Sequence, residues 1–541
     1  MGMNVWKKRY KSRNGEGIYW SLEKSLEYLA EARKFGIRPG LARIEQLLER
    51  LGNPQNACPV IHIAGTNGKG SISSMCAYIA ANSGLRTGLF TSPYLTNFNE
   101  RIRIIDGHEG IQNLYKDARS SEISDEDFAK TLMLIAYEVE IMSVRGFDRP
   151  TEFEMITAAA FVYFAEMRCD LVVLETGMGG RLDSTNVVEE PLATIISALS
   201  YDHTGRLGST ISKIAAEKAG IMRPNVPVFV YNPYDTELTE SDAAIVKQTL
   251  SEHAKNVNAP LSIVNRSDIE YQSSYLTGQT FTYKSAGPFH LQLSGDYQAQ
   301  NAALAIEACR LIIKDENLIQ SGISLAKWAG RLECISQAPF ILIDGAHNKQ
   351  GVYGLRQHLE KFLKGHKLVI LAGVLHDKDY KAMLDIICSS ELYDIAEIIC
   401  TSPDFPRALK AKNLAVEFAK HYNQKNSRTK FREESQNKFL EKSDIDSRDN
   451  FYDQLPNKSQ LKTQNKPRDK YQIKEITELE SKEIPLYNEN RIWFTSDRKA
   501  ATEFAYGLAC KKRLPLVMFG SLYLLGEVRP YLLDLLEGLD N

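Results

Sequence analysis

The sequence has no apolar run approaching the roughly 20 residues that a helix needs to cross a bilayer. Its first 20 residues are basic, but they lack the apolar core of a secretory signal. These two absences predict a cytoplasmic protein without a membrane partner.

Cysteine is scarce and scattered, with eight residues in 541 and no C-x-x-C pair. Zinc sites and disulfide frameworks normally show close, regular cysteine spacing, so neither is expected here. Several cysteines fall within apolar helix or strand patterns, which is typical of reduced thiols in a cytosolic core. The eight are Cys58, Cys76, Cys169, Cys309, Cys334, Cys388, Cys400 and Cys510.

Neither sign of charge predominates: 66 basic residues face 68 acidic ones, a formal charge of -2. The total gives no reason to expect a nucleic-acid partner, because binding to a phosphate backbone needs a concentrated basic surface. With 43% hydrophobic and 25% charged residues, the composition is that of a soluble globular protein. At 541 residues the chain exceeds one ordinary core, so two domains are expected.

Short apolar, β-branched runs alternate with longer helical patterns. Near-continuous apolarity favours strands buried on both faces, and therefore parallel sheets covered by helices. Amphipathic segments lie between them at 151–167 and 210–219, the second with Thr210 as N-cap and Gly220 just past its end. The pattern predicts an α/β fold. The expected strands are Val60–Ala64, Asp170–Glu175, Ala193–Ser197, Pro227–Val230, Phe340–Asp344, Lys367–Leu371 and Leu516–Phe519.

The division into domains is predicted near Leu293. Residues 232–290 are mostly polar, with small antiparallel strands expected around 277–283, and a helix over 301–313 then opens a second strand–helix series. The sequence thus predicts a mostly parallel sheet domain at 1–293 and a smaller Rossmann-like domain at 294–541. Residues 424–490 are rich in charge, Asn, Gln and Ser, which predicts a disordered surface insertion. A regulatory or partner-binding role for the insertion stays open.

The strongest local signal is an apolar strand that runs into Gly65-Thr-Asn-Gly-Lys-Gly-Ser71 and then into an amphipathic helix. Glycines let backbone N–H groups approach a phosphate, Lys69 neutralises outer phosphates and Ser71 can ligate magnesium. The Walker A pattern differs, because it requires glycine where Ile63 stands and Ser or Thr where Gly70 stands. A turn without function is the alternative, but the flanking strand and helix favour a phosphate cradle.

Metal chemistry is predicted at neighbouring strand ends. Glu175 closes one apolar strand, and His203 follows the next one along the chain. The carboxyl ends of parallel strands face the crevice where α/β proteins bind ligands. Together with Ser92 they form a candidate Mg²⁺ site, although histidine is an unusual ligand for magnesium. His203 could instead cap backbone groups in a loop.

Three further residues are candidates for binding the nucleotide or stabilising phosphoryl charge. Arg331 offers a guanidinium for developing phosphoryl charge, or is an ordinary surface arginine. Asp344 ends an apolar strand and could accept from a ribose hydroxyl, with His347 beside the reacting phosphate. By default Lys218, in the last turn of a helix, is a solvated side chain. Residues in both predicted domains would require a cleft between them.

Seven segments occur together and in a characteristic order: His62–Ser71, Thr91–Leu95, Glu175–Asn186, Asp202–Thr204, Glu217–Ile221, Asp344–Asn348 and Gly520–Leu524. In these the chain resembles the folylpolyglutamate synthase and dihydrofolate synthase family, within the wider superfamily of Mur ligases. The resemblance runs from about Phe35 to Arg529, interrupted by the polar insertion. It implies an ATP- and Mg²⁺-dependent ligase that adds L-glutamate to dihydropteroate, to folates or to both through an acyl phosphate.

The resemblance also implies a set of site residues. Lys69, Lys218, Arg331 and His347 would be catalytic, with Lys218 carbamylated. ATP would contact Asn67, Gly68, Lys69, Gly70, Ser71, Asn301, Arg331 and Asp344. Two Mg²⁺ sites, with a monovalent cation as a further possibility, would draw on Ser71, Ser92, Glu175, His203 and Lys218. The pterin-bearing substrate would contact Gly40, Leu41, Ala42, Arg43, Thr151, Glu152, Phe153, Glu154, Leu182, Asp183 and Ser184. Incoming glutamate would lie near His347 and Ser521.

Tyr94 departs from the family pattern, because many relatives have histidine there, and the local substrate contact is therefore in doubt. Two rival functions stay open. A Mur ligase acting on a cell-wall precursor would carry a uridine-nucleotide domain before the phosphate loop, where this chain has only about sixty residues, mostly two short helices. A non-catalytic nucleotide-binding relative would be expected to have lost some of the residues named above. A monomer is expected.

Overall fold

The computed structural model describes residues 20–33, 36, 38–202, 204–422 and 491–540. The chain divides into two compact units. Unit 1 comprises Met1–Cys334 with Ile343–Phe362, and unit 2 comprises Ile335–Leu342 with Leu363–Asn541. The predicted boundary near Leu293 thus falls inside unit 1. The predicted insertion at 424–490 lies outside the described residues.

Unit 1 is built on a seven-stranded sheet of order β3-β2-β4-β1-β5-β6-β7. All neighbouring pairs are parallel except β2 with β3, which is antiparallel. The strands are β1 (Val60–Ala64), β2 (Arg86–Phe90), β3 (Ile102–Asp106), β4 (Leu171–Glu175), β5 (Ala193–Ile196), β6 (Val228–Tyr231) and β7 (Leu261–Val264). The α/β prediction and its strand positions in this unit are confirmed.

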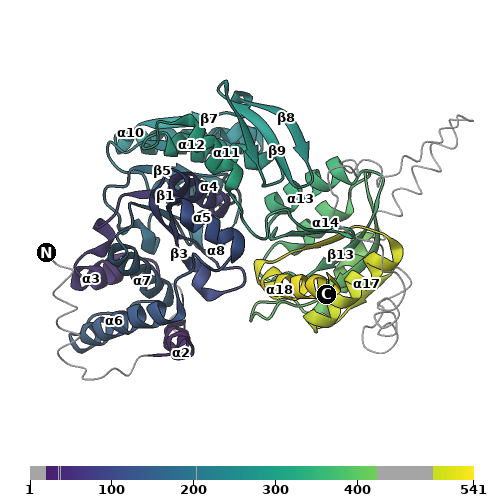
Figure 1. The fold of residues 1–541 in the computed structure, drawn as a ribbon, viewed down its shortest axis with the longest axis horizontal. Coiled ribbons are helices and arrows are strands. Elements are labelled where there is room, and N and C mark those ends of the chain that lie inside the picture. Colours follow the sequence, from purple (N-terminus) through teal and green to yellow (C-terminus); the bar gives the residue numbers. More distant parts are fainter. Residues whose placement is uncertain (1–19, 34–35, 37, 203, 423–490, 541) are drawn as a thin grey trace, which may run out of the picture. The chain divides into compact units, whose positions relative to one another are not determined.

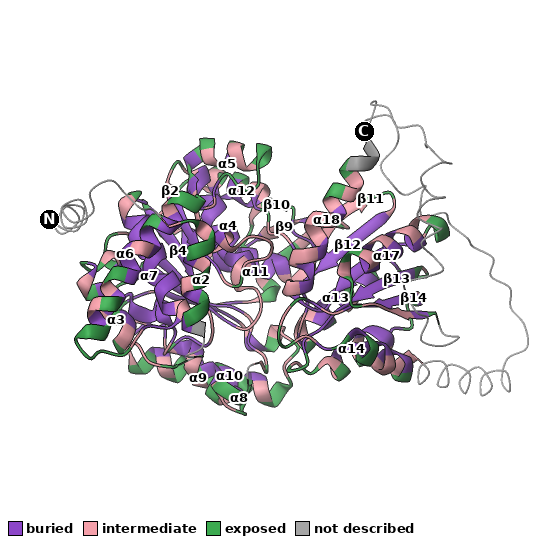
Figure 2. Ribbon diagram, turned by 90° about the horizontal axis from the view of Figure 1, so that it is seen from below, coloured by how far each residue is buried: buried purple, intermediate pink, exposed green. Residues whose placement is uncertain are grey.

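Each face of this sheet has its own helical layer (Figure 1). Because side chains alternate along a strand, Ile61 and Ile63 join one core with α4 and α11, whereas Val60 joins the other core with α6 and α7. Strands and inward helix faces are accordingly buried (Figure 2). The helices of unit 1 are α2 (Leu22–Arg33), α3 (Ala42–Arg50), α4 (Lys69–Asn82), α5 (Gly107–Lys116), α6 (Asp125–Val144), α7 (Glu152–Glu166), α8 (Thr204–Leu207), α9 (Ile211–Ala219), α10 (Glu240–Asn256), α11 (Asp296–Cys309), α12 (Glu316–Leu325) and α13 (Lys349–Phe362).

Local capping explains where the helices begin. Thr151 and Glu154 form a capping box at the start of α7, and the Thr210 hydroxyl accepts from Lys213 N at the start of α9. The predicted helix over 301–313 instead spans Asp296–Cys309, because Gly295 turns the chain at φ +96° and lets α11 begin at once. Since α11 shares a core with α4, the fresh strand–helix series does not open a new unit.

Unit 1 also carries a small antiparallel sheet. Strands β8 (Ile269–Tyr275), β9 (Gly278–Tyr283) and β10 (Ala286–Leu291) pair in the order β10-β9-β8. The prediction of antiparallel strands near 277–283 is confirmed.

Unit 2 holds most of a six-stranded sheet of order β11-β12-β16-β13-β14-β15. Its central strand β13 runs parallel to β14 and β16. The chain passes from unit 2 to unit 1 within β12, between Leu342 and Ile343. The strands are β11 (Glu333–Gln337), β12 (Phe340–Asp344), β13 (Lys367–Ala372), β14 (Asp394–Cys400), β15 (Ile492–Phe494) and β16 (Leu516–Phe519). The helices of unit 2 are α14 (Tyr380–Cys388), a helix at 411–422, α17 (Arg498–Lys512) and α18 (Leu522–Asp540).

All eight cysteines are free thiols. Within the described residues, no helix is both long and apolar enough to span a membrane.

Candidate active site

The phosphate loop leaves β1 at Gly65 and enters α4 at Lys69. Gly65 has φ +152°, and a Cβ there would lie 1.7 Å from Ser197 Oγ, so only glycine fits. The Ser197 hydroxyl donates to Asn67 O at 2.6 Å, and Thr66 N donates to Ala198 O at 3.0 Å. The end of β5 therefore fixes the loop before any ligand arrives.

Lys69 folds back over this loop. Its Nζ donates to Gly65 O at 3.2 Å and to Thr66 O at 3.4 Å, and it lies 3.9 Å from Glu175 Oε1. The loop and the end of β4 thus bring the ammonium and the carboxylate together. A cation at the head of α4 adds to the positive end of the helix dipole, which favours an anion in front of it.

Glu175 and Ser92 are the described residues that best fit a magnesium ion. Glu175 is 4% exposed, and burial raises the pKa of its carboxyl to about 7, against the lowering influence of Lys69. Ser92 N donates to Glu175 Oε2 at 3.3 Å, while the buried Ser92 Oγ has no hydrogen-bond partner in the described part of the chain. A hydroxyl oxygen with a free lone pair beside a buried carboxylate supplies the hard oxygen ligands that Mg²⁺ prefers, and the cation would neutralise the buried negative charge.

The rest of the predicted metal set is only partly testable. His203 lies outside the described residues. Among those that are described, no group of three or more His, Cys, Asp or Glu gathers as a metal cluster. Ser71, a further described member of the predicted set, is 3% exposed and accepts from Gln298 Nε2 at 3.2 Å.

Lys218 contradicts its default reading as a solvated side chain. It is 3% exposed, and its Nζ donates to Gly65 O at 2.7 Å. Burial first, and the nearby Lys69 second, lower the pKa of the Lys218 amine to about 7, against the raising influence of Asp202 and Asp183. The amine therefore loses its proton over a pH range centred near 7, and it lies directly behind the phosphate loop.

Residues of α11 reach the same loop. Asn301 Oδ1 accepts from Tyr231 Oη at 2.5 Å, and its Nδ2 donates to Gln298 Oε1 at 2.8 Å. Gln298 in turn donates to Ser71. A Cβ on Gly68 would lie 2.5 Å from Asn301 Oδ1, so the predicted ATP contact Asn301 directly adjoins the loop.

Asp344 holds together the residues of unit 1 that lie on either side of the 335–342 stretch. Asp344 is buried, and its carboxylate accepts from Leu332 N and Ala346 N at 2.8 Å each. Burial raises the pKa of Asp344, while Arg331 lowers it; Arg331 lowers that of Glu175 as well. Arg331 thus lies close enough to act on both predicted nucleotide and metal residues.

His347 Nδ1 is 2.8 Å from Gly345 O. The neighbouring Asn348, which the sequence prediction missed, forms a reciprocal amide pair with Asn67 at 3.0 and 3.3 Å. Its only signal was its place after Asp344-Gly-Ala-His347. Ser521, the other predicted glutamate residue, is buried in unit 2 at the start of α18.

The three predicted acceptor segments adjoin one another. Arg43 donates from Nε to Glu154 Oε2 at 3.1 Å and from Nη2 to Glu154 Oε1 at 2.9 Å. Glu154 also accepts from Thr151 N at 2.6 Å. A Cβ on Gly177 would lie 2.5 Å from the Phe153 ring, which joins the second segment to the loop before Leu182–Ser184.

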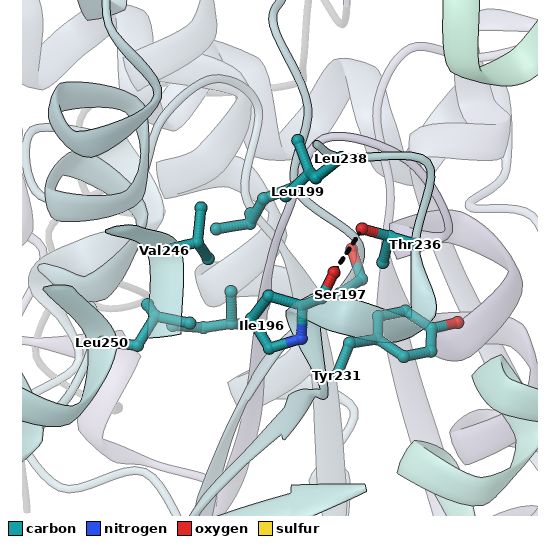
Figure 3. Close-up of a pocket in the computed structure, with 9 residues that line it drawn as sticks. Ile196, Ser197, Leu199, Tyr231, Thr236, Leu238, Val246 and Leu250 are labelled. Carbon is teal, nitrogen blue, oxygen red and sulfur yellow. Dashed lines mark hydrogen bonds between the residues drawn. The ribbon is translucent and has the colours of Figure 1, made fainter. Parts of the chain in front are cut away.

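A cavity of about 220 Å³, including space open to solvent, lies between β5, β6 and α10 and contains none of the predicted site residues. Figure 3 shows its mainly apolar walls, with the Thr236 hydroxyl bonded to Pro233 O. We assign it to packing behind the phosphate loop, since Ser197 and Tyr231 line it but direct their hydroxyls to Asn67 O and Asn301.

Comparison with known proteins identifies the family. The Mur ligase middle domain model matches residues 122–309, and the Mur ligase glutamate ligase domain model matches 330–445. The dihydrofolate synthase/folylpolyglutamate synthase of Bacillus subtilis is 37% identical over 394 residues, covering 70% of this chain and 85% of that protein. The chain belongs to the folylpolyglutamate synthase/dihydrofolate synthase family. As a member of this family it is an ATP-dependent ligase.

Two further members support the assignment. The folylpolyglutamate synthase of Lacticaseibacillus casei is 35% identical over 380 residues, covering 68% of this chain and 82% of that protein. The Mycobacterium tuberculosis folylpolyglutamate synthase, solved with ADP and AMPPCP, superposes with a TM-score of 0.70 at 25% identity, covering 94% of this chain and 98% of that one. The fold class expected from the sequence is thereby confirmed.

Proposed function

We propose that this ligase joins L-glutamate to dihydropteroate and also extends folates at the γ-carboxyl, converting ATP to ADP and phosphate. The observation that carries the proposal is the meeting of Lys69, Glu175 and the Ser92 hydroxyl, which has no partner among the described residues, beside the phosphate loop. It occurs in a chain 37% identical to a protein named for both reactions.

The first step is attack of the acceptor carboxylate on the γ-phosphorus of ATP. Phosphoryl transfer spreads negative charge over the equatorial oxygens, so catalysis rests on positioned cations. Lys69 stands at the head of α4 for this purpose, and Arg331 is the second cation. Mg²⁺ held by Ser92 and Glu175, with Ser71, His203 and Lys218 as the further ligands, would shield the phosphate charges.

The proposed ATP contacts lie in the loop and around it. The loop is lined by Asn67, Gly68, Gly70 and Ser71. Asn301 adjoins it, and Asp344 would accept a hydrogen bond from the ribose. Asn67 and Asn348 would have to open their amide pair for Asn67 to face the nucleotide. This exchange of one hydrogen-bond partner for another costs little, because neither amide is left unpaired.

Lys218 is proposed to act as a carbamate. Carbamate formation needs a neutral amine, and burial supplies one near neutral pH. The product would be an anion behind the loop, able to bind a second metal ion and to offset the charge of Lys69. The Gly65 carbonyl, 2.7 Å away, would keep its hydrogen bond from the remaining N–H.

The second step is attack of the glutamate amine on the acyl phosphate, and phosphate leaves. No protein nucleophile is needed. His347 and Ser521 are the residues proposed to contact the incoming glutamate, and the cytoplasmic location and monomeric state stay predictions. The acceptor wall is proposed to be Gly40–Arg43, Thr151–Glu154 and Leu182–Ser184, because the Arg43–Glu154 pair binds the first two segments together.

A single activity is the competing possibility, since relatives of similar identity are named for one reaction as well as for two. The Lacticaseibacillus casei relative is named folylpolyglutamate synthase alone, and a Saccharomyces cerevisiae relative, 31% identical, is named dihydrofolate synthetase. Both activities are favoured here because the 37% identical protein carries both names.

The test is phosphate release by the purified protein with ATP, Mg²⁺ and glutamate, comparing dihydropteroate, tetrahydrofolate and no acceptor. Phosphate release together with a mass gain of one glutamate on each acceptor would support both activities. A gain on one acceptor alone would restrict the function to that reaction. If neither acceptor stimulates phosphate release in a folded, ATP-binding sample, the proposal fails.

A further inference from the structure

His62 is fully buried in β1, three residues before the phosphate loop, and none of the steps above uses it. It lies in the middle of the sheet, beside Leu174 of β4 and Thr194 of β5. An imidazole in such a place needs a polar partner, because an unpaired buried polar group is costly. Its Nε2 lies 2.8 Å from Thr185 Oγ1.

Thr185 passes this contact on to Asp183. The Thr185 hydroxyl is 2.7 Å from Asp183 Oδ1, which also accepts from Thr185 N at 3.1 Å. The other carboxylate oxygen accepts from Met178 N at 2.7 Å. Asp183 therefore ties together the two ends of the loop that runs from Gly177 to the short helix η3 (Ser184–Val187).

His62, Thr185 and Asp183 form a hydrogen-bond relay, and the number of available hydrogens fixes its direction. The Thr185 hydroxyl has one hydrogen; if it goes to the Asp183 carboxylate, the hydroxyl oxygen accepts from His62 Nε2–H. His62 Nδ1 then carries a lone pair, and it has no hydrogen-bond partner among the described residues. The opposite direction would leave a buried N–H at Nδ1 without an acceptor, which is rarer and more costly than an unused lone pair. Burial also lowers the pKa of His62 to about 3, which keeps the ring neutral.

The loop that Asp183 holds contacts two parts of the site. Gly177 fits against the Phe153 ring of the second acceptor segment, where a Cβ would lie 2.5 Å from Cζ. Gly180 fits against Lys218, where a Cβ would lie 3.0 Å from Cα. The Asp183 oxygens already accept from Met178 and Thr185. The main role of this carboxylate is therefore to hold the loop in its conformation.

We propose that His62 is a positioning residue for the pterin-bearing acceptor: through Thr185 and Asp183 it holds the Gly177–Leu182 loop in the shape that receives the acceptor. The ligand identity rests on the proposed function, whereas the relay itself does not. Because the phosphate loop is fixed separately by Ser197 and Ala198, loss of the relay should affect the acceptor and spare ATP.

Four variants of the full-length protein separate the relay from general packing. His62→Leu removes the donor and keeps an apolar side chain, whereas His62→Gln retains an N–H donor. Thr185→Val removes the hydroxyl, and Thr185→Ser restores it. The matched control is Thr194→Val: Thr194 is a buried threonine beside His62 whose Oγ1 has no partner among the described residues.

We expect His62→Leu and Thr185→Val each to raise the KM for dihydropteroate or tetrahydrofolate roughly 10-fold. A change of this size corresponds to the loss of about one hydrogen bond. The KM for ATP should change less than twofold. The double variant should be no worse than either single one, since members of one network are non-additive. His62→Gln, Thr185→Ser and Thr194→Val should stay within threefold of the parent.

Two measurements do not depend on catalysis. Hydrogen exchange followed by mass spectrometry should accelerate in peptides covering 177–186 in the Leu and Val variants of the relay, and not in Thr194→Val. Nitrogen NMR of the histidine-labelled protein, assigned by the signal missing in His62→Gln, should show the Nε2–H form. If His62→Leu does not fold, Thr185→Val and the NMR spectrum carry the test.

The inference is overturned by an Nδ1–H tautomer, by unchanged loop exchange, or by equal rises in both KM values. It is also overturned if Thr185→Ser is as impaired as Thr185→Val. If the parent protein releases no phosphate with either acceptor, the proposed function fails, and exchange and NMR alone decide the relay.

Discussion

The indole of Trp328 occupies the space that a side chain on Gly70 would need. A Cβ built on Gly70 would lie 2.8 Å from Trp328 Nε1 and 2.9 Å from Cζ2. Trp328 is held by packing against the α4–α11 core and by Arg103, whose guanidinium lies 5.7 Å from the ring centroid. This contact explains one of the two departures from Walker A, because the position after Lys69 has no room for Ser or Thr.

We therefore expect Gly70→Ser to lower kcat/KM for ATP by about 10-fold or more, because overpacking here costs about 1–3 kcal/mol and displaces the start of α4. The measurement is steady-state phosphate release at varied ATP. The decisive comparison is with the double variant Gly70→Ser, Trp328→Ala, which should recover part of the loss because the indole is gone.

Trp328→Ala alone serves as the reference for that comparison. If the double variant is as poor as the product of the two single effects, Gly70 and Trp328 act independently, and steric exclusion by the indole does not explain the glycine.

Lys69→Met should reduce turnover by two to four orders of magnitude, since it removes the cation nearest the phosphoryl charge. The fold should persist, because the bonds of Lys69 Nζ within the described part of the chain are to carbonyls of its own loop, and it lies 3.9 Å from Glu175. Far-UV circular dichroism and phosphate release measure the two effects. A variant retaining more than about half its activity would exclude Lys69 from the mechanism.

How far the sequence predicts this molecule depends on the range of the interactions. The strand–glycine loop–helix unit around Lys69 is local, so its elements and their order were predictable from apolar runs and caps. The burial of Lys218 was not predictable from its helix, because it depends on Gly65, 153 residues away in the chain. The same holds for Trp328 over Gly70 and for His62 with Thr185, which join strands and loops that only the sheet order brings together.

The domain boundary illustrates the same limit. A helix start near Leu293 was visible in the sequence, but whether α11 packs on the first sheet or begins a new unit depends on its buried face. The alanines and Leu304 of α11 lie in the same hydrophobic core as the buried residues of α4. Residues 331–348 are likewise shared between the units, a division that no local signal marks.

Lys218 predicts a specific pH dependence. In the folded chain its amine has a pKa of about 7, against 10.5 when exposed, so the unfolded chain binds more protons between these values. Burial of the charged form therefore destabilises the fold fully below about pH 7, and this penalty disappears as the pH rises towards 10.5. In bicarbonate-free buffer, Lys218→Met should have a higher Tm than the parent at pH 6.5, and the gap should narrow by pH 9.5.

The same amine should make activity depend on bicarbonate. Because carbon dioxide reacts with the neutral amine, added bicarbonate should activate the depleted protein more at pH 8 than at pH 6. A Lys218→Met variant as active as the parent, with and without bicarbonate, would contradict the carbamate.

The buried Arg43–Glu154 pair predicts a substantial loss of stability when it is broken. Glu154 is 2% exposed, accepts two bonds from Arg43 and also caps α7 through Thr151 N. Glu154→Ala leaves the Arg43 side chain, which is 13% exposed, without its carboxylate and removes the glutamate half of the capping box, so the free energy of unfolding should fall by about 3 kcal/mol. Urea unfolding measures this loss of free energy.

The matched control is Glu126→Ala, which breaks an exposed pair with Lys130 on α6 and should change stability by less than about 0.5 kcal/mol. Equal losses in the two variants would mean that burial does not govern the strength of the Arg43–Glu154 pair. A KM for the acceptor that stays unchanged in Glu154→Ala would remove this pair from the proposed acceptor wall.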